Sequence, residues 1–384
     1  MQTGQDIHDN AVYERARLSR DARFDGRFFV GVRTTGIYCR PVCPANAPKS
    51  ENVTFYPTAA AAAEAGYRPC LRCRPECAPG TPAWSGTSTT VRRGLNLIAD
   101  GALDDGSVEQ LAERLGVTSR HLRRLFTTHL GASPVAVAHT RRLHFAKRLI
   151  DDTDLRLADI AVAAGYGSVR RFNDAFQKTY GRSPRELRKN GRDVETARDP
   201  AAPLSIRLAY REPYDWEALL DFFAGRAIPG VESVHDGVYR RTVSIDGATG
   251  LLEVRLDPRG GAIVANILNL DTRHLFHVVR RVREMFDVDA PIADIRDVLG
   301  KDRALKPLLR ARPGIRVPGA WDPFELGVRA ILGQQVSVKA ATTLSGRLVD
   351  RYGDKLDGDT ASAAAEWGLT HTFPSPGRLA RGRL

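Results

Sequence analysis

Four cysteines near the N-terminus carry the clearest chemistry in this sequence. Cys39, Cys43, Cys70 and Cys73 stand as C-x3-C-x26-C-x2-C, and the 384 residues contain one further cysteine, Cys77. Two closely spaced pairs of thiolates are a common ligand set for a tetrahedral structural Zn²⁺ site. The spacing therefore predicts one Zn²⁺ bound by four cysteine side chains, with Cys77 as a bystander.

Two other interpretations of the cysteines are two disulfides and a set of unligated core thiols. Disulfides need an oxidising compartment. The N-terminal segment is polar and charged, without an apolar run and a small-residue cleavage site. We therefore expect a cytoplasmic protein with reduced cysteines. No stretch approaches the ~18 consecutive apolar residues of a membrane span, so no membrane partner is expected.

Spacing alone leaves the reactivity of such a site open. Most sites with four cysteine ligands are inert and serve folding only. Four thiolates on one Zn²⁺ nevertheless sum to a formal charge of −2, which keeps the sulfurs deprotonated and electron-rich. A thiolate of this kind near DNA could attack an electrophilic methyl group by direct displacement.

The surrounding sequence predicts the elements that position the cysteines. Residues 27–33 alternate and are rich in β-branched and aromatic side chains, so they indicate a strand, as does Val53–Tyr56. Cys39 is expected on a turn, because nearby prolines oppose a helix. Residues 58–65 indicate a short helix that Gly66 ends. So small a module cannot fold by burial alone, so the metal should be required for folding.

Length and composition predict a multidomain α+β protein, because 384 residues exceed one hydrophobic core. Residues 79–90 are rich in Pro, Gly, Ser and Thr, and residues 191–203 lack apolar periodicity, so both are predicted linkers. The predicted domains are a zinc module at 1–78, an all-α domain at 91–190, an antiparallel-sheet and helix domain at 204–318 and a helical segment at 319–384.

The all-α domain has the pattern of two helix-turn-helix units. Ser107 and Gln110 form a capping box, and Thr118 and Ser168 each precede a helix with one apolar and one basic face. Pro134 begins the connecting helix. A bundle with solvated arginines is the alternative, but the repetition of the unit favours DNA recognition. The predicted DNA-reading side chains are Arg120, His121, Arg123, Arg124, Arg170, Arg171 and Asn173.

The charge distribution also favours a polyanionic partner. The formal net charge is +12, and residues 1–200 carry 31 Lys and Arg against 22 Asp and Glu. The basic excess therefore lies with the cysteines and the helix-turn-helix pattern. Together they predict binding to double-stranded DNA.

Two motifs around the cysteines, TTGIYCRPVC and GYRPCLRCRP, closely resemble the N-terminal domain of the Ada family of alkylation-response proteins. The resemblance implies that Cys39 is the single-use acceptor of a methyl group from a DNA methylphosphotriester, with Cys43, Cys70 and Cys73 as its zinc co-ligands. It also places Thr35 and Arg68 at DNA-contacting positions. Pro44 and Asn46 depart from the family, where arginine is common.

The sequence from 88 to 190 resembles an AraC-type DNA-binding domain, most clearly in DIAVAAGYGSVRRFNDAFQKTYGRSPRELRK. Methylation of Cys39 would change the formal charge of the zinc cluster from −2 to −1. That change reduces repulsion from DNA phosphates and is worth on the order of 1 kcal/mol or more in DNA affinity. The resemblance therefore implies a transcriptional activator, with RNA polymerase as an expected partner.

The third domain is predicted to have strands at 204–208, 239–245, 250–256 and 262–268 and a helix at 274–286. The runs PYDWEALLDFFAGRAIPGVE and ARPGIRVPGAWDPFELGVRAILGQQVSVKAA resemble the N-terminal part of AlkA-type 3-methyladenine DNA glycosylases. Neither the helix-hairpin-helix nor the catalytic aspartate of that family is found before residue 384, so 319–384 is expected to be an incomplete glycosylase domain.

Several details support the expectation that base excision is absent or impaired. Gln335 stands where the family often places an apolar wedge. We expect the four C-terminal aspartates to be solvated: Asp350, Asp354, Asp357 and Asp359. O6-methylguanine repair is not expected either, because no cysteine follows Cys77.

The sequence as a whole predicts an alkylation-response protein of the cytoplasm. It would transfer one methyl group per molecule from a DNA phosphotriester to Cys39 and then activate repair genes at promoter sites. A DNA-3-methyladenine glycosylase and a zinc-containing transcription factor without catalytic function are the alternatives.

Overall fold

The computed structural model describes residues 4–78, 89–104, 106–153, 155–188 and 203–382. The chain divides into two compact units, Met1–Thr196 and Ala197–Leu384, which are considered separately below. The division falls inside the predicted linker at 191–203, of which residues 191–202 lie outside the described parts. In the first predicted linker, α3 already begins at Thr89, and residues 79–88 are not described.

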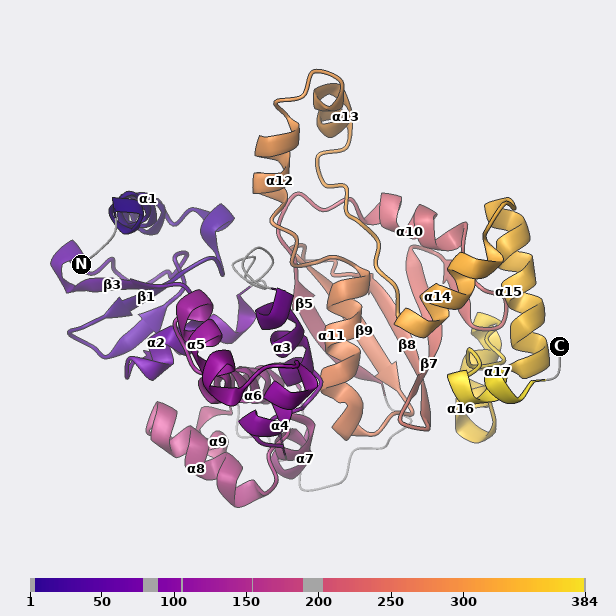
Figure 1. Cartoon of the computed structure of the whole chain (residues 1–384), viewed down its shortest axis with the longest axis horizontal. Coiled ribbons are helices and arrows are strands. Elements are labelled where there is room, and N and C mark those ends of the chain that lie inside the picture. The colour runs from indigo at the N-terminus through magenta and orange to yellow at the C-terminus, as the bar shows by residue number, and fades with distance from the viewer. Residues whose placement is uncertain (1–3, 79–88, 105, 154, 189–202, 383–384) are drawn as a thin grey trace. The chain divides into compact units, whose positions relative to one another are not determined.

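The N-terminal module of the first unit contains a four-stranded sheet in the order β3-β1-β2-β4 (Figure 1). β1 pairs antiparallel with both β2 and β3, whereas β2 and β4 run parallel. β-Branched and aromatic side chains favour strands here as predicted. The strands are β1 (Phe29–Val32), β2 (Ile37–Cys39), β3 (Val53–Tyr56) and β4 (Arg68–Pro69).

One prediction for this module was wrong in detail. Cys39 was expected on a turn, but it is the last residue of β2 and pairs with Val30 of β1. The turn lies earlier, where Gly36 takes a positive φ of 63° and its N–H donates to Val32 O at 2.9 Å. Prolines after Cys39 therefore end the strand instead of displacing the cysteine from it.

Helical segments surround the strands of the module. The predicted helix at 58–65 is α2 (Ala59–Glu64), whose N-cap Thr58 accepts from Ala61 N at 3.0 Å. α1 (Gly4–Ser19) precedes the sheet, and the short helix η3 (Pro75–Cys77) follows the last zinc-ligand candidate. Phe28, fully buried, stacks on Tyr13 of α1 at 4.3 Å between ring centroids, so α1 covers one face of the sheet.

The described part of the first unit from Thr89 to Arg188 is mainly helical and has the two predicted helix-turn-helix units. Ser107 and Gln110 form the capping box, and Thr118, Ser133 and Ser168 cap α5, α6 and α8. The helices are α3 (Thr89–Ala99), α4 (Val108–Arg114), α5 (Ser119–Leu130), α6 (Pro134–Asp152), α7 (Leu157–Ala163), α8 (Val169–Tyr180) and α9 (Pro184–Leu187).

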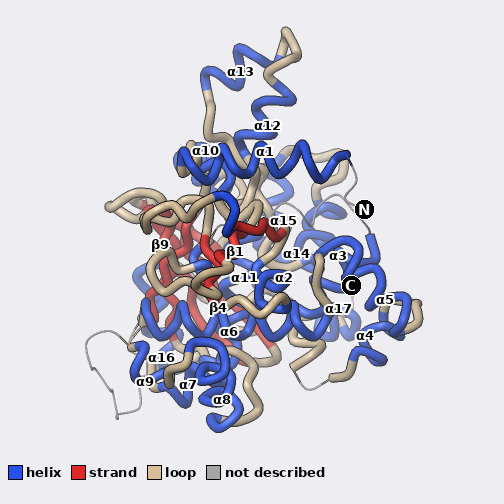
Figure 2. Tube along the Cα trace, turned by 90° about the vertical axis from the view of Figure 1, so that its left-hand side faces the viewer, coloured by secondary structure: helices blue, strands red, loops and turns tan. Residues whose placement is uncertain are grey.

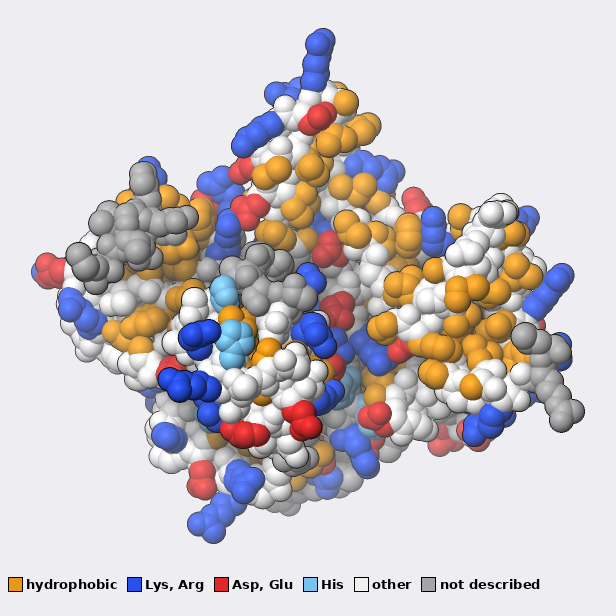
Figure 3. Space-filling model, in the orientation of Figure 1, with side chains coloured by type: hydrophobic (Ala, Val, Ile, Leu, Met, Phe, Trp, Pro, Cys, Tyr) orange, Lys and Arg blue, Asp and Glu red, His pale blue; other side chains and the backbone are white. Residues whose placement is uncertain are grey.

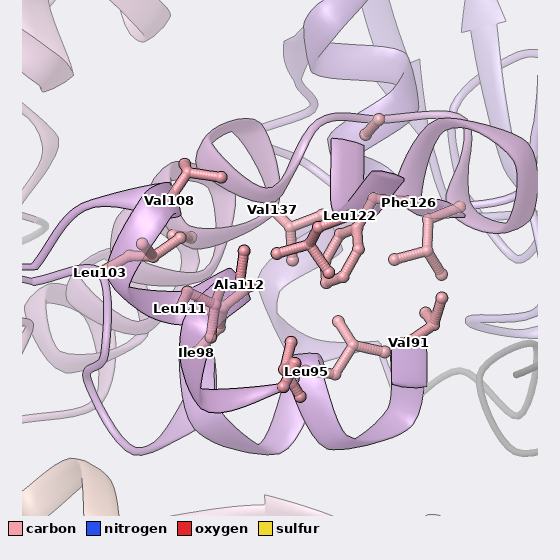
Figure 4. Close-up of a cluster of buried hydrophobic side chains, with 14 of the residues drawn as sticks. Val91, Leu95, Ile98, Leu103, Val108, Leu111, Ala112, Leu122, Phe126 and Val137 are labelled. Atoms are coloured by element: carbon pink, nitrogen blue, oxygen red, sulfur yellow. The ribbon is translucent and has the colours of Figure 1, made fainter. Parts of the chain in front are cut away.

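The core of the first helix-turn-helix unit is formed mainly by side chains of α3, α4, α5 and α6 (Figure 4). Leu111 of α4 and Leu122 and Phe126 of α5 are fully buried. Ile98 of α3 and Val137 of α6 close the cluster. Burial of each such side chain contributes about 1.5–3 kcal/mol, which fixes the angle between α4 and α5.

The second unit contains a five-stranded antiparallel sheet in the order β5-β9-β8-β7-β6. All four predicted strands are present, whereas β6 (Glu232–His235) was not predicted. The other strands are β5 (Leu204–Ala209), β7 (Val238–Ile245), β8 (Ala248–Leu256) and β9 (Ala262–Leu268). Helix α11 (Leu275–Met285), predicted at 274–286, is amphipathic and buries Val278 and Val282.

The remaining helices of this unit flank the sheet. The pair formed by α12 and α13 extends beyond the strands in both views (Figures 1 and 2), and exposed apolar side chains gather over α14 and α15 (Figure 3). The helices are α10 (Trp216–Ala224), α12 (Ile292–Leu299), α13 (Leu305–Ala311), α14 (Pro323–Leu332), α15 (Val338–Tyr352), α16 (Gly358–Ala364) and α17 (Pro376–Arg381).

None of the helices in the described residues combines the length and the apolar character that crossing a membrane requires.

Candidate metal centre and DNA-reading surface

The four predicted ligands come together at one end of the small sheet. The ligand atoms of Cys39, Cys43, Cys70 and Cys73 all lie within 4.8 Å of one another. Four sulfurs at the usual Zn–S distance of about 2.3 Å would be about 3.8 Å apart in a tetrahedron. The spacing of the sulfurs therefore fits a single Zn²⁺ ion, and a donor set of four thiolates suits that ion.

Strand register explains why the two cysteine pairs meet. β2 and β4 run parallel with Tyr38 opposite Pro69, so the next residues, Cys39 and Cys70, leave the sheet side by side. The Cys70 N–H also donates to Tyr38 O at 3.0 Å. A short turn after Cys39 and after Cys70 brings the second cysteine of each pair, Cys43 or Cys73, back to the cluster.

Backbone amides support three of the four sulfurs. Arg40 N donates to Cys73 Sγ at 3.3 Å. The pKa of Cys43 is lowered to about 7, mainly by its hydrogen bond with Cys39 and also by the Ala45 N–H. Hydrogen bonds with Cys39 and other cysteines, and with the Cys73 N–H, likewise lower the pKa of Cys70.

Accessibility separates the four cysteines as well. Cys70 and Cys73 are only 8% and 7% exposed, whereas Cys39 and Cys43 are half-buried. A group that attacks a substrate must be reachable from solvent. Cys39 and Cys43 are therefore the two cysteines of the cluster that a substrate could reach.

Arg40 and Asp25 form a support for the cluster that the sequence did not reveal. Arg40 Nε donates to Asp25 Oδ1 at 2.8 Å, and Arg40 Nη1 donates to Cys73 O at 3.1 Å. Asp25 is 6% exposed. The arginine that follows Cys39 thus binds the chain at Cys73. Pairing between residues 15 positions apart leaves no periodic signal in a sequence.

The predicted phosphate-contacting residues of the zinc module lie close together. Arg68 N donates to Gly36 O at 2.9 Å, which brings β4 next to the turn that contains Thr35. Thr35 is exposed and Arg68 half-buried, at the end of the sheet from which β2 leads to Cys39. Pro44 and Asn46, where the Ada family often has arginine, are exposed too.

The predicted DNA-reading side chains lie on α5 and α8. Leu122, Phe126, Phe172 and Phe176 are fully buried, so the opposite helix faces are left to solvent. His121 is half-buried, and the other six are exposed: Arg120, Arg123, Arg124, Arg170, Arg171 and Asn173.

Three of these arginines have surface partners. Arg123 lies 3.1 Å from Glu109, Arg124 lies 3.1 Å from His121, and Arg170 lies 4.0 Å from Asp174. Exposed pairs of this kind contribute little to stability, so these guanidinium groups can exchange their partner for phosphate at small cost.

The second unit has a cavity of about 360 Å³ beside α14 and α15. Arg241, fully buried, donates to Glu325 Oε2 at 2.7 Å in its wall, and its pKa is raised through the nearby Glu325 despite the opposing effect of burial. Gln335 is exposed with a positive φ of 59°. The four C-terminal aspartates are exposed as expected, and Asp354 pairs with Arg378 at 2.6 Å.

Three domain families match the chain. They are the metal binding domain of Ada at residues 13–76, a helix-turn-helix domain at 111–190 and the AlkA N-terminal domain at 205–322. A probable bifunctional transcriptional activator/DNA repair enzyme AlkA of Mycobacterium tuberculosis (strain ATCC 25618 / H37Rv) is 43% identical over 367 residues, which are 95% of this chain and 72% of that protein. The chain belongs to the bifunctional Ada/AlkA family.

Two shorter relatives match different parts of this family member. The bifunctional transcriptional activator/DNA repair enzyme AdaA of Bacillus subtilis (strain 168) is 30% identical over 47% of this chain and 84% of its own length. The DNA-3-methyladenine glycosylase 2 of Escherichia coli (strain K12) is 34% identical over 45% of this chain and 56% of its own length. The resemblances stated from the sequence are thereby confirmed for all three domains, as is the zinc site.

Proposed function

We propose that this protein repairs DNA methylphosphotriesters by transferring the methyl group to Cys39, once per molecule, and that methylation converts it into a transcriptional activator. Zn²⁺ held by the four cysteines supplies the charge that keeps their sulfurs as thiolates. The observation that carries the choice of Cys39 is its place as the first cysteine of a domain that matches the metal binding domain of Ada, where its sulfur is accessible.

The transfer step is a direct displacement at carbon. Cys39 Sγ attacks the methyl carbon of the phosphotriester, and a sulfur–carbon bond forms as the carbon–oxygen bond breaks. The electron pair of the broken bond stays on oxygen, which becomes part of an ordinary phosphodiester. Cys39 ends as a thioether without a route back to the thiolate. The protein is therefore consumed in the reaction, as a methyltransferase of one turnover.

The proposed DNA contacts of the zinc module are Thr35 and Arg68, just before β2 and at the start of β4. Thr35 and Arg68 lie at the same sheet end and would hold the backbone by hydrogen bonding and charge. Loss of one formal negative charge from the cluster then favours binding to DNA. The basic faces of α5 and α8 would bind the promoter. A methylated protein that stays bound there longer would then contact RNA polymerase in the cytoplasm.

The test uses DNA with a methylphosphotriester, incubated with the zinc-loaded chain and followed by peptide mapping. The added methyl should appear on the peptide containing Cys39. Cys39→Ser should abolish transfer, whereas Cys43→Ser, a matched change in the other accessible cysteine, should reduce it only as far as zinc is lost. A chain that binds zinc and DNA but gains no methyl would leave a zinc-containing regulator without catalytic function.

A DNA-3-methyladenine glycosylase is the second candidate, because the second unit matches the AlkA N-terminal domain. Base excision is tested separately with the purified chain and alkylated DNA. Release of free 3-methyladenine would favour this second candidate.

A further inference from the structure

The zinc module and the helical domain share an extensive joint within the first unit. α2 packs on α6, and β4, which leads to Cys70, contacts α8. Thr58 Oγ1 donates to Leu130 O at the end of α5 at 3.0 Å, and Ser133 N donates to Glu64 at 3.1 Å. The module that holds the cysteines therefore touches both helices predicted to read DNA and the helix that connects them.

One part of the joint reaches the arm that carries Cys39. The neighbouring Tyr38 is fully buried, and its hydroxyl lies 2.6 Å from Nε2 of His144 on α6. The same tyrosine accepts the Cys70 N–H through its backbone oxygen at 3.0 Å. The ring of Tyr38 thus ties the strand end that delivers both cysteines to a helix 106 residues away in sequence.

A second part of the joint reaches the arm that carries Cys73. Directly after this cysteine, Arg74 lies 2.8 Å from Asp151 of α6 and 3.0 Å from Asp152. Glu76 lies 3.7 Å from Lys147 Nζ, and Lys147 also pairs with Asp151.

These ions are out of water. The side chains of Glu76, Asp151 and Lys147 are only 2%, 3% and 4% exposed, so each charge depends on its partners. Removing one partner from a buried set of charges is strongly destabilising, whereas replacing a whole pair by neutral groups is often tolerated. The joint can therefore be opened selectively by mutation.

We infer that His144 and Lys147 are positioning residues for the cysteine cluster, and that α6 supports the cluster and both DNA-reading helices together. His144 holds the arm of Cys39 through Tyr38, and Lys147 holds the arm of Cys73 through Glu76. A change in the cluster reaches the reading helices through these contacts. The regulatory meaning of this coupling rests on the proposed function, whereas the coupling itself does not require methyl transfer.

The coupling predicts that zinc stabilises the DNA-reading helices as well as its own module. Without zinc, the two cysteine arms lose their common anchor, and Tyr38 and Glu76 are held less firmly against α6. Backbone amides of α6 and α8 should then exchange with solvent about tenfold faster or more. Residues outside the joint, such as those of the β5–β9 sheet in the second unit, provide the internal reference.

The test measures amide hydrogen exchange of the full chain with and without a zinc chelator. Lys147→Met is the uncoupling variant, and Lys49→Met, at an exposed lysine of the zinc module, is its matched control. The double variant Lys147→Met with Glu76→Gln removes both charges. Tyr38→Phe removes the hydroxyl alone and provides an independent readout, the rate of zinc release.

In the wild type and in Lys49→Met, chelation should speed exchange in α6 and α8. In Lys147→Met these helices should exchange fast already, with less than about a twofold further effect of chelation, and the double variant should regain the dependence on zinc. Tyr38→Phe should release zinc several-fold faster. The inference is overturned if chelation of the wild type affects the zinc module alone, if Lys147→Met behaves like Lys49→Met, or if Tyr38→Phe releases zinc at the wild-type rate. Failure of methyl transfer would leave all of these measurements unchanged.

Discussion

Replacing Arg40 by Met should weaken zinc binding strongly, although Arg40 is not itself a ligand. Its guanidinium pairs with Asp25 and donates to Cys73 O at 3.1 Å, so it holds the second cysteine pair beside Cys39. The side chains of Arg40 and Asp25 are 18% and 9% exposed. Methionine keeps an unbranched, largely apolar side chain and loses every donor.

The magnitude follows from the burial of the pair. Removal of one partner of a fully buried ion pair costs about 3–5 kcal/mol. Partial exposure of Arg40 reduces this to about 2–3 kcal/mol. Because the module should fold only as it binds metal, the loss appears in the apparent affinity for Zn²⁺. Each 1.4 kcal/mol is tenfold, so the apparent Kd should rise roughly 30- to 150-fold.

The assay is competition for Zn²⁺ between the protein and a chromophoric chelator. Arg23→Met is the control, because Arg23 pairs with Asp21 at 2.7 Å on the surface with 63% of its side chain exposed. Its apparent Kd should stay within about twofold of the wild type. An Arg40→Met protein that binds zinc within about threefold of the wild type would refute the role given to this arginine.

Three further predictions concern the helical domain. Burial, with a contribution from Arg148, lowers the pKa of His144 to about 3 from 6.5. The unfolded chain therefore binds a proton at this histidine more readily than the folded chain. The free energy of unfolding should fall as the pH drops from 6.5 towards 3, by up to about 1.4 kcal/mol per pH unit. Chemical denaturation of the wild type across this range, compared with His144→Phe, should show the steeper loss in the wild type. Phe172→Ala, in a fully buried ring 4.9 Å from Phe176, should cost about 3–5 kcal/mol in urea unfolding followed by circular dichroism, and a loss below about 1 kcal/mol would contradict its place in the core. Arg171→Gln, at an exposed side chain, should weaken DNA binding and reduce the salt dependence of log K by about 1, without shifting the urea midpoint; an unchanged salt slope would remove Arg171 from the DNA surface.

Features that depend on residues close together in the sequence were predicted correctly. Ser107 and Gln110 form the predicted capping box, because a cap depends on residues three apart. The cysteine spacing identified a cluster that the structure brings within 4.8 Å. The strands of the second unit follow their alternating patterns closely, although β6 escaped notice because it is short and not strictly alternating.

Features made by long-range pairing were not predictable from one sequence. The prolines that follow Cys39 led to the prediction of a turn, because the sequence does not show that Cys39 pairs with Val30 of β1. Lys147 is a charged residue, yet its side chain is only 4% exposed and pairs with Glu76 and Asp151. Tyr38 gave no sign of its bond to His144. Such contacts depend on how the zinc module packs on α6, and neither spacing nor propensity specifies that packing.

The most direct measurement of the central claim is the stoichiometry of methyl transfer. Zinc-loaded protein is mixed with excess DNA that carries a labelled methylphosphotriester, and protein-bound label is followed to its plateau and then mapped. The account predicts a plateau of one methyl per chain, all of it on Cys39, and none in Cys39→Ser. Label on another residue, continued turnover beyond one methyl per chain, or no label on a protein that binds both zinc and DNA would contradict it.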